Sequence, residues 1–262
     1  MSRPVLETKG LTIRFGGHVA VDSVSAAFHA GTLTAIVGPN GAGKTTYFNL
    51  ISGQLSATAG SVLIGGVEVT TLGAARRAKF GIGRAFQLTN LFPNLTVHEN
   101  VRLAVQARAG GGASIFSRWD SRRDWIEQAD RFIEAANLAD KHATAAMALP
   151  HGDKRKLEVA IIMALEPHVF MFDEPTAGMS VDDVPVILDL IKKLKAGGDK
   201  TILLVEHKME VVKSLADRIV VLHNGRLVAD GDPAEVIGSA VVQAAYLGIP
   251  AGRRSAGEAP RG

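Results

Sequence analysis

The sequence contains no cysteine, and this absence excludes both disulfide bonds and thiolate metal sites. It is compatible with a reducing cytoplasm. Aromatic residues are also scarce, at 5% of the 262 residues, so a hydrophobic core must be built mainly from Ala, Val, Leu and Ile. The overall hydrophobic content of 47% is enough for one large domain, or for one domain with an insertion.

Long apolar runs are missing as well. The longest candidate, residues 159–165, is far shorter than the ~20 residues that span a bilayer. The first residues lack the basic start and apolar run of a signal peptide. We therefore expect a soluble chain, one that can still attach to a membrane protein. Residues 250–262 are rich in Gly, Ala, Pro and Arg, and we expect them to form a disordered tail.

A strong excess of charge is also absent. The chain has 29 basic and 26 acidic residues, which gives a net charge of +3. This balance is too mild to indicate a nucleic-acid-binding protein, so we expect no nucleic-acid partner.

The first third of the chain is rich in strand-forming residues. Gly16 and Gly17 predict a hairpin turn between two strands, and Gly65 and Gly66 predict another turn within residues 61–69. The predicted elements here are strands at residues 11–15, 19–28 and 32–37, and a helix at residues 44–51.

The middle of the chain differs, because amphipathic patterns at residues 96–108 and 121–136 predict helices joined by a glycine-rich loop at 109–114. Beyond residue 152, strand and helix patterns alternate, which favours a mostly parallel sheet. No internal repeat is visible, so one such core is expected. The predicted later elements are helices at 154–165, 182–195 and 209–216, and strands at 169–172, 201–205 and 219–222.

Residues 38–45 match the pattern G-x-x-x-x-G-K-[ST], between a predicted strand and a predicted helix. Glycines let backbone N–H groups face phosphates, and a helix N-terminus adds partial positive charge. Lys44 supplies a full charge, and the Thr45 hydroxyl can bind Mg²⁺. The sequence therefore predicts a site for ATP and Mg²⁺. The predicted phosphate-binding residues are Gly38, Pro39, Asn40, Gly41, Ala42, Gly43, Lys44, Thr45 and Thr46.

Two carboxylates, Asp173 and Glu174, follow the apolar run at residues 168–172. In an open parallel sheet, ligands bind beyond the carboxyl ends of the strands. Asp173 is therefore placed to hold Mg²⁺, directly or through water. Glu174 is placed to orient or deprotonate an attacking water.

Together these motifs resemble the ATP-binding cassette of ABC transporters, over nearly the whole chain. The resemblance implies an α/β fold: a P-loop NTPase cassette with an antiparallel β subdomain and a helical subdomain, at about residues 96–165, inserted in a RecA-like core. A single ATP-binding domain is expected over residues 1–249. The segments that carry the resemblance are residues 38–45, 86–87, 149–153, 172–176 and 206–207.

Within this family, the sequence is most similar to the cassettes for uptake of branched-chain (hydrophobic) amino acids. The glycine-rich insertion after Arg108 also suits that type. The segments concerned are residues 14–17, 81–87, 90–92, 205–209 and 245–248.

The resemblance also assigns roles to individual residues. Phe15 matches the aromatic residue that stacks on adenine. Gln87 matches the glutamine that contacts Mg²⁺ or the attacking water and senses the membrane subunit. His207 matches the histidine that reaches the γ-phosphate, and it follows a predicted strand at the correct edge of the sheet.

One family motif departs from its usual form. The signature Leu-Ser-Gly-Gly-Gln stands here as residues 149–153, with Pro150 and Asp153 in place of the serine and the glutamine. The signature acts on ATP held by the opposite cassette, and Gly152 keeps its place there. Pro150 has neither a hydroxyl nor an N–H, and Asp153 would either add negative charge near the phosphates or cap the helix. Ser180 stands where the family often has Asp.

The resemblance implies a cassette that pairs with a second cassette, as a homodimer or heterodimer, and binds two ATP molecules between them. It also implies transmembrane permease subunits, an external solute-binding protein, and a peripheral position on the cytoplasmic face of the inner membrane. Movement would pass to the permeases through the Gln87 segment and the helical subdomain. The substrate is selected by those other chains.

Three alternatives stay open at the level of sequence. A lipopolysaccharide-export type cassette shares the Tyr-Leu-Gly ending, but we expect it to lack the insertion near residue 110. A soluble ABC ATPase acting on nucleic acid or ribosomes usually has two cassettes or long coiled coils, whereas this chain has one phosphate loop and no sustained heptads. A regulatory module without turnover is disfavoured by Glu174. The run of basic residues at 154–156 is interpreted as a solvated helix face.

Overall fold

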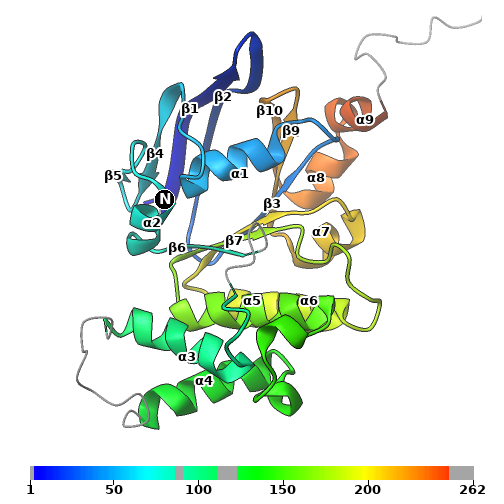
Figure 1. The fold of residues 1–262 in the computed structure, drawn as a ribbon. Coiled ribbons are helices and arrows are strands. Elements are labelled where there is room, and N and C mark those ends of the chain that lie inside the picture. Colours follow the sequence, from blue (N-terminus) through cyan, green and yellow to red (C-terminus); the bar gives the residue numbers. More distant parts are fainter. Residues whose placement is uncertain (1–2, 86–90, 111–122, 248–262) are drawn as a thin grey trace, which may run out of the picture.

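The computed structural model describes residues 3–85, 91–110 and 123–247. Its centre is a six-stranded sheet in the order β10-β9-β3-β8-β7-β6 (Figure 1). Every neighbouring pair is parallel except β9 and β10, so the carboxyl ends of five strands meet at one edge. The strands are β3 (Leu33–Val37), β6 (Ile82–Ala85), β7 (Val169–Asp173), β8 (Thr201–Val205), β9 (Arg218–His223) and β10 (Arg226–Gly231).

The central strands are unbroken apolar runs because both faces of the sheet are covered. Side chains alternate between the two faces of a strand. In β7, Phe170 and Phe172 enter one hydrophobic core while Val169 and Met171 enter the other, and all four are buried. The strand is thereby fixed between two layers, and its last residue, Asp173, emerges at the edge where the carboxyl ends meet.

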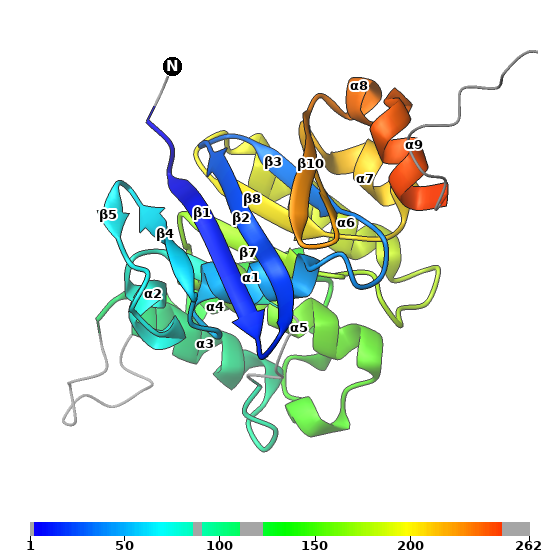
Figure 2. The same ribbon diagram turned by 90° about the horizontal axis from the view of Figure 1, so that it is seen from above.

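On one face, helix α1 (Lys44–Ser52) lies between the six-stranded sheet and an antiparallel sheet of order β2-β1-β4-β5 (Figure 2). Gly60 lets β4 approach β1 closely, since a Cβ there would lie 2.3 Å from the carbonyl oxygen of Gly10. The strands are β1 (Leu6–Phe15), β2 (His18–Phe28), β4 (Ala59–Ile64) and β5 (Val67–Glu68).

The opposite face of the six-stranded sheet is covered by helices, and two further helices pack onto them (Figure 1). The first of these, α3, begins with a capping box, in which the Thr96 hydroxyl accepts from the Glu99 amide and the Glu99 carboxylate accepts from the Thr96 amide. The elements are α3 (Val97–Arg108), α4 (Arg123–Ala135), η3 (Ala139–Lys141), η4 (Ala146–Ala148), α5 (His151–Leu165), α6 (Val184–Ala196) and α7 (Met209–Leu215).

A third, smaller core lies where helices α8 and α9 of the C-terminal region meet α7 and strand β9. Val236 and Val242 belong to this core, together with Val212 and Val221. Within the described parts of the chain, no helix is long and apolar enough to cross a membrane. The remaining helices are α2 (Ala74–Lys79), α8 (Pro233–Gly238) and α9 (Ala240–Leu247).

The α/β architecture with its antiparallel sheet and helical layer confirms the predicted fold class. The predicted start of the first strand was wrong, because β1 begins at Leu6. Strand β10 was missed, although Asn224 and Gly225, with φ of 49° and 75°, form the kind of turn that joins hairpin strands. The expected tail, most of the glycine-rich loop and Gln87 lie outside the described residues.

Arg77 of α2 is nearly fully buried, with 1% exposure, and it binds the C-terminal end of α1. Its guanidinium donates hydrogen bonds to the carbonyl oxygens of Leu50 and Ile51, and to those of Thr70 at 2.7 Å and Leu72 at 2.8 Å. Carbonyls in the last turn of a helix lack partners within the helix, and a cation there also offsets the helix dipole. Arg77 therefore fixes α1 against the segment that leads to α2.

Replacing this guanidinium should destabilise the whole domain. Arg77→Ala is expected to lower the free energy of unfolding by at least about 3 kcal/mol, because several buried carbonyls lose their donors. Urea denaturation monitored by circular dichroism measures the change. Arg76→Ala on the exposed face of the same helix is the control and should change the free energy by no more than about 0.5 kcal/mol. Equal effects of the two variants would contradict the capping role.

Candidate nucleotide-binding and active site

The predicted phosphate loop joins the carboxyl end of β3 to the N-terminus of α1. Glycine is required twice by close approach: a Cβ on Gly38 would lie 2.1 Å from the Leu222 carbonyl oxygen, and one on Gly43 would lie 2.5 Å from that of Ala20. Both glycines also have positive φ, of 151° and 94°. The loop therefore wraps around the start of α1, whose first amides face a bound anion in such an arrangement.

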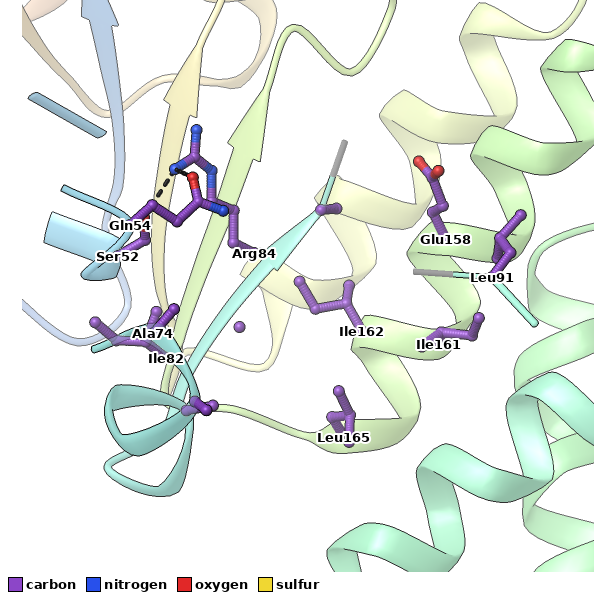
Figure 3. A pocket seen from close by; sticks show the side chains of 14 residues that line it. Ser52, Gln54, Ala74, Ile82, Arg84, Leu91, Glu158, Ile161, Ile162 and Leu165 are labelled. Carbon is purple, nitrogen blue, oxygen red and sulfur yellow. Dashed lines mark hydrogen bonds between the residues drawn. The ribbon is translucent and has the colours of Figure 1, made fainter. Parts of the chain in front are cut away.

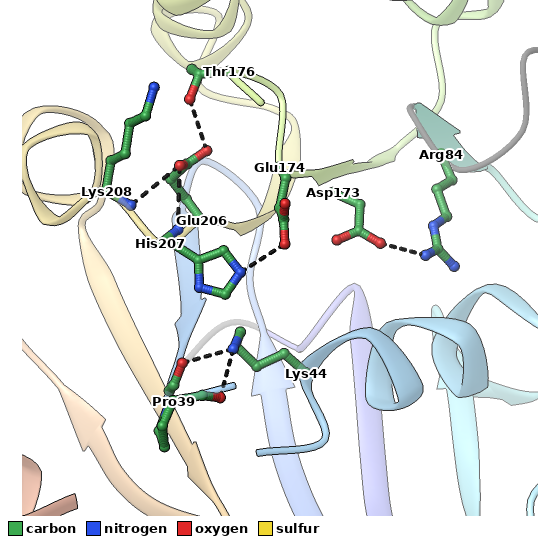
Figure 4. Close-up of polar contacts among 10 residues, drawn as sticks. Pro39, Lys44, Arg84, Asp173, Glu174, Thr176, Glu206, His207 and Lys208 are labelled. Carbon is green, nitrogen blue, oxygen red and sulfur yellow. Dashed lines mark hydrogen bonds and ion pairs between the residues drawn. The ribbon is translucent and has the colours of Figure 1, made fainter. Parts of the chain in front are cut away.

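Lys44, the first residue of α1, is only 5% exposed. Its Nζ donates hydrogen bonds to the carbonyl oxygens of Gly38 at 2.7 Å and Pro39 at 2.9 Å (Figure 4). Burial lowers the pKa of Lys44, while the carboxylates of Glu174 and Asp173 oppose that shift. The ammonium group thus lies under the loop, between it and the acidic pair.

Asp173 forms a buried ion pair that the sequence did not reveal. Arg84 Nη2 donates to Asp173 Oδ2 at 2.8 Å, and the two side chains are only 7% and 10% exposed (Figure 4). Arg84 Nη1 also donates to Asn49 Oδ1 and to Ser52 Oγ of α1, both at 2.8 Å. The arginine therefore links the end of β6 to both the end of β7 and the end of α1.

Glu174 and His207 meet at the carboxyl edge of the sheet, as predicted for residues that follow β7 and β8. His207 Nε2 lies 2.7 Å from Glu174 Oε1 (Figure 4). The backbone of Glu174 has a left-handed φ of 51°, which is rare for a residue with a side chain and is often found at functional sites. A carboxylate paired with an imidazole can hold and orient a water molecule.

Glu206 holds the backbone that carries His207, a role that the sequence motif alone did not reveal. It is 4% exposed, and its carboxylate accepts hydrogen bonds from the backbone amides of His207 and Lys208, each at 3.2 Å. It also accepts one from the Thr176 hydroxyl at 3.3 Å. Its position directly after a buried strand was the available signal.

A cavity of about 580 Å³ brings most of the predicted residues together. Phe15 stands at its rim with 50% exposure, a large exposure for an aromatic side chain. Gly38 and Pro39 do not line the cavity but accept hydrogen bonds from Lys44, and Asp173 is paired with Arg84. The lining residues are Phe15, His18, Ala20, Asn40, Gly41, Ala42, Gly43, Lys44, Thr45, Thr46, Glu174 and His207.

The altered signature lies away from this cavity, at the start of α5. Pro150 occupies the N-cap position and His151 begins the helix. Gly152 packs against Asp183, since a Cβ there would lie 2.5 Å from Asp183 Oδ2 and this carboxylate would have to shift. Asp153 neither caps the helix nor stands free near a phosphate, because it is 5% exposed and its carboxylate binds Lys141 and Lys156.

The interpretation of residues 154–156 as a solvated helix face was wrong for Lys156. This residue is 6% exposed, and its ammonium binds the carboxylates of Asp153 and Asp183. Ser180 joins the same cluster, because its hydroxyl donates to Asp183 Oδ2 at 2.8 Å. The start of α5 is thereby tied to the loop that precedes α6.

A separate groove of about 490 Å³ lies between the sheet and the helical layer (Figure 3). Ile161, Ile162 and Leu165 of α5 line one side, and Ile82 with residues of α2 lines the other. Burial raises the pKa of Glu158, the acidic residue in the groove, although Arg155 opposes the shift. Arg84 connects this groove with Asp173.

Comparison with known proteins gives a consistent picture. A family profile described as ABC transporter matches residues 21–177. The chain is 37% identical over 253 residues to the high-affinity branched-chain amino acid transport ATP-binding protein BraF of Pseudomonas aeruginosa, covering 95% of this chain and 99% of that protein. It is 36% identical, with the same coverage, to LivG of Escherichia coli K12, which has the same description. A Nod factor export ATP-binding protein I of Ralstonia nicotianae is 34% identical over 90% of this chain and 70% of its own length.

Solved structures agree with the fold. The crystal structure of an ATP-binding cassette of an ABC transporter in its ADP conformation matches with a TM-score of 0.79 and 28% identity, over 94% of this chain and all of that one. A nucleotide-free cassette from an ABC transporter matches with a TM-score of 0.78, also at 28% identity, over 93% and 98% of the two chains.

The Arg84–Asp173 pair offers a direct test of the site. Arg84→Ala should lower the free energy of unfolding by about 3–5 kcal/mol, because it leaves a buried carboxylate unpaired. Urea denaturation measures this loss. The double variant Arg84→Ala/Asp173→Ala should recover part of it, since no lone charge then remains. If the double variant loses the sum of both single effects, the two side chains do not interact as described.

Proposed function

Because the chain belongs to the ABC transporter family, as an ATP-binding protein of that family, we propose that it is the ATP-hydrolysing subunit of an importer for branched-chain or related amino acids. The observation that carries this proposal is the similarity to two branched-chain amino acid transport proteins. In each comparison the match covers almost the full length of this chain and of the relative. The export protein is matched over a smaller share of its length. The import assignment is therefore favoured over the export and non-transport alternatives.

ATP is proposed to bind in the cavity at the start of α1. The loop amides and Lys44 hold the phosphates, with the dipole of α1 adding to their attraction. On binding, the Nζ of Lys44 exchanges the carbonyl oxygens of Gly38 and Pro39 for phosphate oxygens. Phe15, at the rim, stacks on the adenine ring.

The donor set at the site suits Mg²⁺. Thr45 offers a hydroxyl and Asp173 a carboxylate, and oxygen ligands of this kind are the ones Mg²⁺ prefers. Asp173 has one oxygen engaged by Arg84, which leaves the other for the ion or its water. Gln87 is proposed as a further ligand. Bound Mg²⁺ would neutralise charge on the phosphates.

Hydrolysis is proposed to use Glu174 and His207. Glu174 orients or deprotonates the attacking water, and His207 contacts the γ-phosphate. Support comes from their geometry, because His207 Nε2 and Glu174 Oε1 are 2.7 Å apart and both residues line the cavity that Lys44 also lines. Glu206 holds the backbone of His207 in position.

The second half of each ATP site is proposed to come from another cassette. ATP would join the two cassettes because its γ-phosphate contacts the loop of one and the signature around Gly152 of the other. Hydrolysis removes those contacts and the pair opens. The chain would sit peripherally on the cytoplasmic face of the inner membrane, bound to permease subunits that receive substrate from an external solute-binding protein.

Glu174→Gln tests turnover. The variant should bind ATP with unchanged affinity but lose at least about 100-fold in ATPase rate, because a general base contributes 10²–10⁴-fold. Phosphate release measures the rate. In the host organism, the same change should abolish uptake of radiolabelled branched-chain amino acids.

The matched control for this variant is Glu210→Gln, at an exposed position in the first turn of α7. It should leave rate and uptake unchanged. A Glu174→Gln protein with normal turnover would favour a regulatory module, whereas loss of turnover without loss of uptake would contradict the amino acid importer.

Pro150→Ser tests the altered signature. Serine fits the backbone of Pro150, with φ of −56° and ψ of 160°, and restores the hydroxyl at the start of α5. We expect a higher ATPase rate in the assembled complex if the half-site that uses this signature is weakened by proline. Pro150→Ala, which adds no hydroxyl, is the control and should give a smaller effect. Unchanged rate and ATP affinity in the serine variant would reject a weakened half-site.

A further inference from the structure

Three metal-binding side chains converge in the helical layer, away from the ATP cavity. His98 lies in the first turn of α3, Asp130 lies in α4, and His142 follows the short helix η3. One ligand atom from each residue can be chosen so that all three lie within 4.8 Å of one another. The cluster therefore joins three segments that are separate in the sequence.

The backbone holds the two histidines side by side. The His98 amide donates to the His142 carbonyl oxygen at 3.1 Å, and the Val97 amide donates to that of Thr144 at 2.9 Å. Thr96 and Ala145 form an antiparallel bridge next to them. The two imidazole rings stack with centroids 4.4 Å apart and planes at 26°. The placement of the rings thus results from main-chain pairing and not from a chance surface approach.

Asp130 faces both rings from α4. Its Oδ1 lies 3.0 Å from His142 Nε2 and 3.7 Å from His98 Nε2. An ion bonded at about 2.0–2.2 Å to each ligand can bridge atoms separated by up to about 4 Å. Both separations from the carboxylate are within that span.

In the part of the chain that the structure describes, the Nε2 atom of His98 lacks a hydrogen-bond partner, which leaves it available as a metal ligand. His98 is 8% exposed, and among the described residues this nitrogen is buried with no hydrogen-bond partner. The Asp130 oxygen at 3.7 Å is too distant for a hydrogen bond. Buried polar atoms are nearly always satisfied, and one that is not is explained by a partner such as a water molecule or an ion.

We propose that His98, Asp130 and His142 bind a divalent transition-metal ion, with Zn²⁺ the best fit. Two imidazole nitrogens and one carboxylate oxygen form a ligand set suited to Zn²⁺, whereas Mg²⁺ and Ca²⁺ prefer oxygen ligands throughout. The side chains of Asp130 and His142 are 40% and 46% exposed, so solvent has access and a water molecule can complete a tetrahedral site.

The bound ion would act as a cross-link within the helical layer. It would connect the start of α3 to the middle of α4 and to the segment after η3, which are otherwise joined by packing and by the backbone pairs above. The ligand residues do not line the nucleotide cavity, so metal binding here can be measured without ATP.

The test is a metal titration of the full chain after treatment with EDTA and without nucleotide. Isothermal titration calorimetry with ZnCl₂ should show one equivalent bound, and Co²⁺ should give the visible absorption of a tetrahedral nitrogen and oxygen site. Thermal unfolding should shift to higher temperature with Zn²⁺. His142→Gln and Asp130→Asn, at half-exposed positions, should each weaken Zn²⁺ binding by at least about 10-fold.

Two controls separate this site from other histidines. His29→Gln, outside the cluster, should bind Zn²⁺ like the unaltered chain. His207→Gln removes an imidazole that contacts a carboxylate outside the cluster and should leave the Co²⁺ spectrum unchanged. His98→Gln should abolish the spectrum while circular dichroism without metal stays unchanged. No saturable Zn²⁺ binding, or Zn²⁺ binding of unchanged affinity in both His142→Gln and Asp130→Asn, would overturn the proposal.

Discussion

Two buried arginines fix the C-terminal end of α1, and the geometry of the phosphate loop at its other end depends on them. Arg77 donates hydrogen bonds to backbone carbonyl oxygens in the last turn of the helix. Arg84 donates through Nη1 to the Asn49 side chain in the same helix and forms an ion pair with Asp173 through Nη2. Since α1 lies between two sheets, its axis is also held by the shared hydrophobic core. A short helix that is fixed in this way can present its first amides to a phosphate with little reorganisation, which favours electrostatic binding.

Sequence patterns predicted those parts of the site that depend on local order. Each of Lys44, Glu174 and His207 comes shortly after a different buried strand in the sequence. Because the carboxyl ends of these parallel strands meet at one edge of the sheet, the three residues lie close together there. Patterns could not predict the partner of Asp173, because Arg84 is remote in sequence and meets it only through the pairing of β6 with β7. Lys156 was wrongly predicted to be solvent-exposed for the same reason. One of the two carboxylates that bind it belongs to Asp183, in the loop before helix α6. The strand β10 was predictable from its Asn-Gly turn.

The proposed contact between cassettes has a rigid support in this chain. Asp153, Lys156, Asp183 and Ser180 connect the first turn of α5 to the loop before α6 through ion pairs and a hydrogen bond. Gly152 allows the two to approach closely. A signature that departs from the usual residues is therefore still carried on a well-anchored helix start, and its position is set by these ion pairs and this hydrogen bond.

The hydrogen bonds of Lys44 to the loop carbonyls have a consequence for nucleotide affinity. The amine is already occupied by the chain's own oxygen atoms, which act as an internal competitor for any incoming anion. The affinity for nucleotide then reflects the difference between the bonds of Lys44 to phosphate and its bonds to the loop carbonyls. It is therefore lower than the phosphate contacts alone would give. The same pairing gives the carbonyl oxygens of Gly38 and Pro39 a donor from within the chain, so these loop oxygens are satisfied by Lys44 itself.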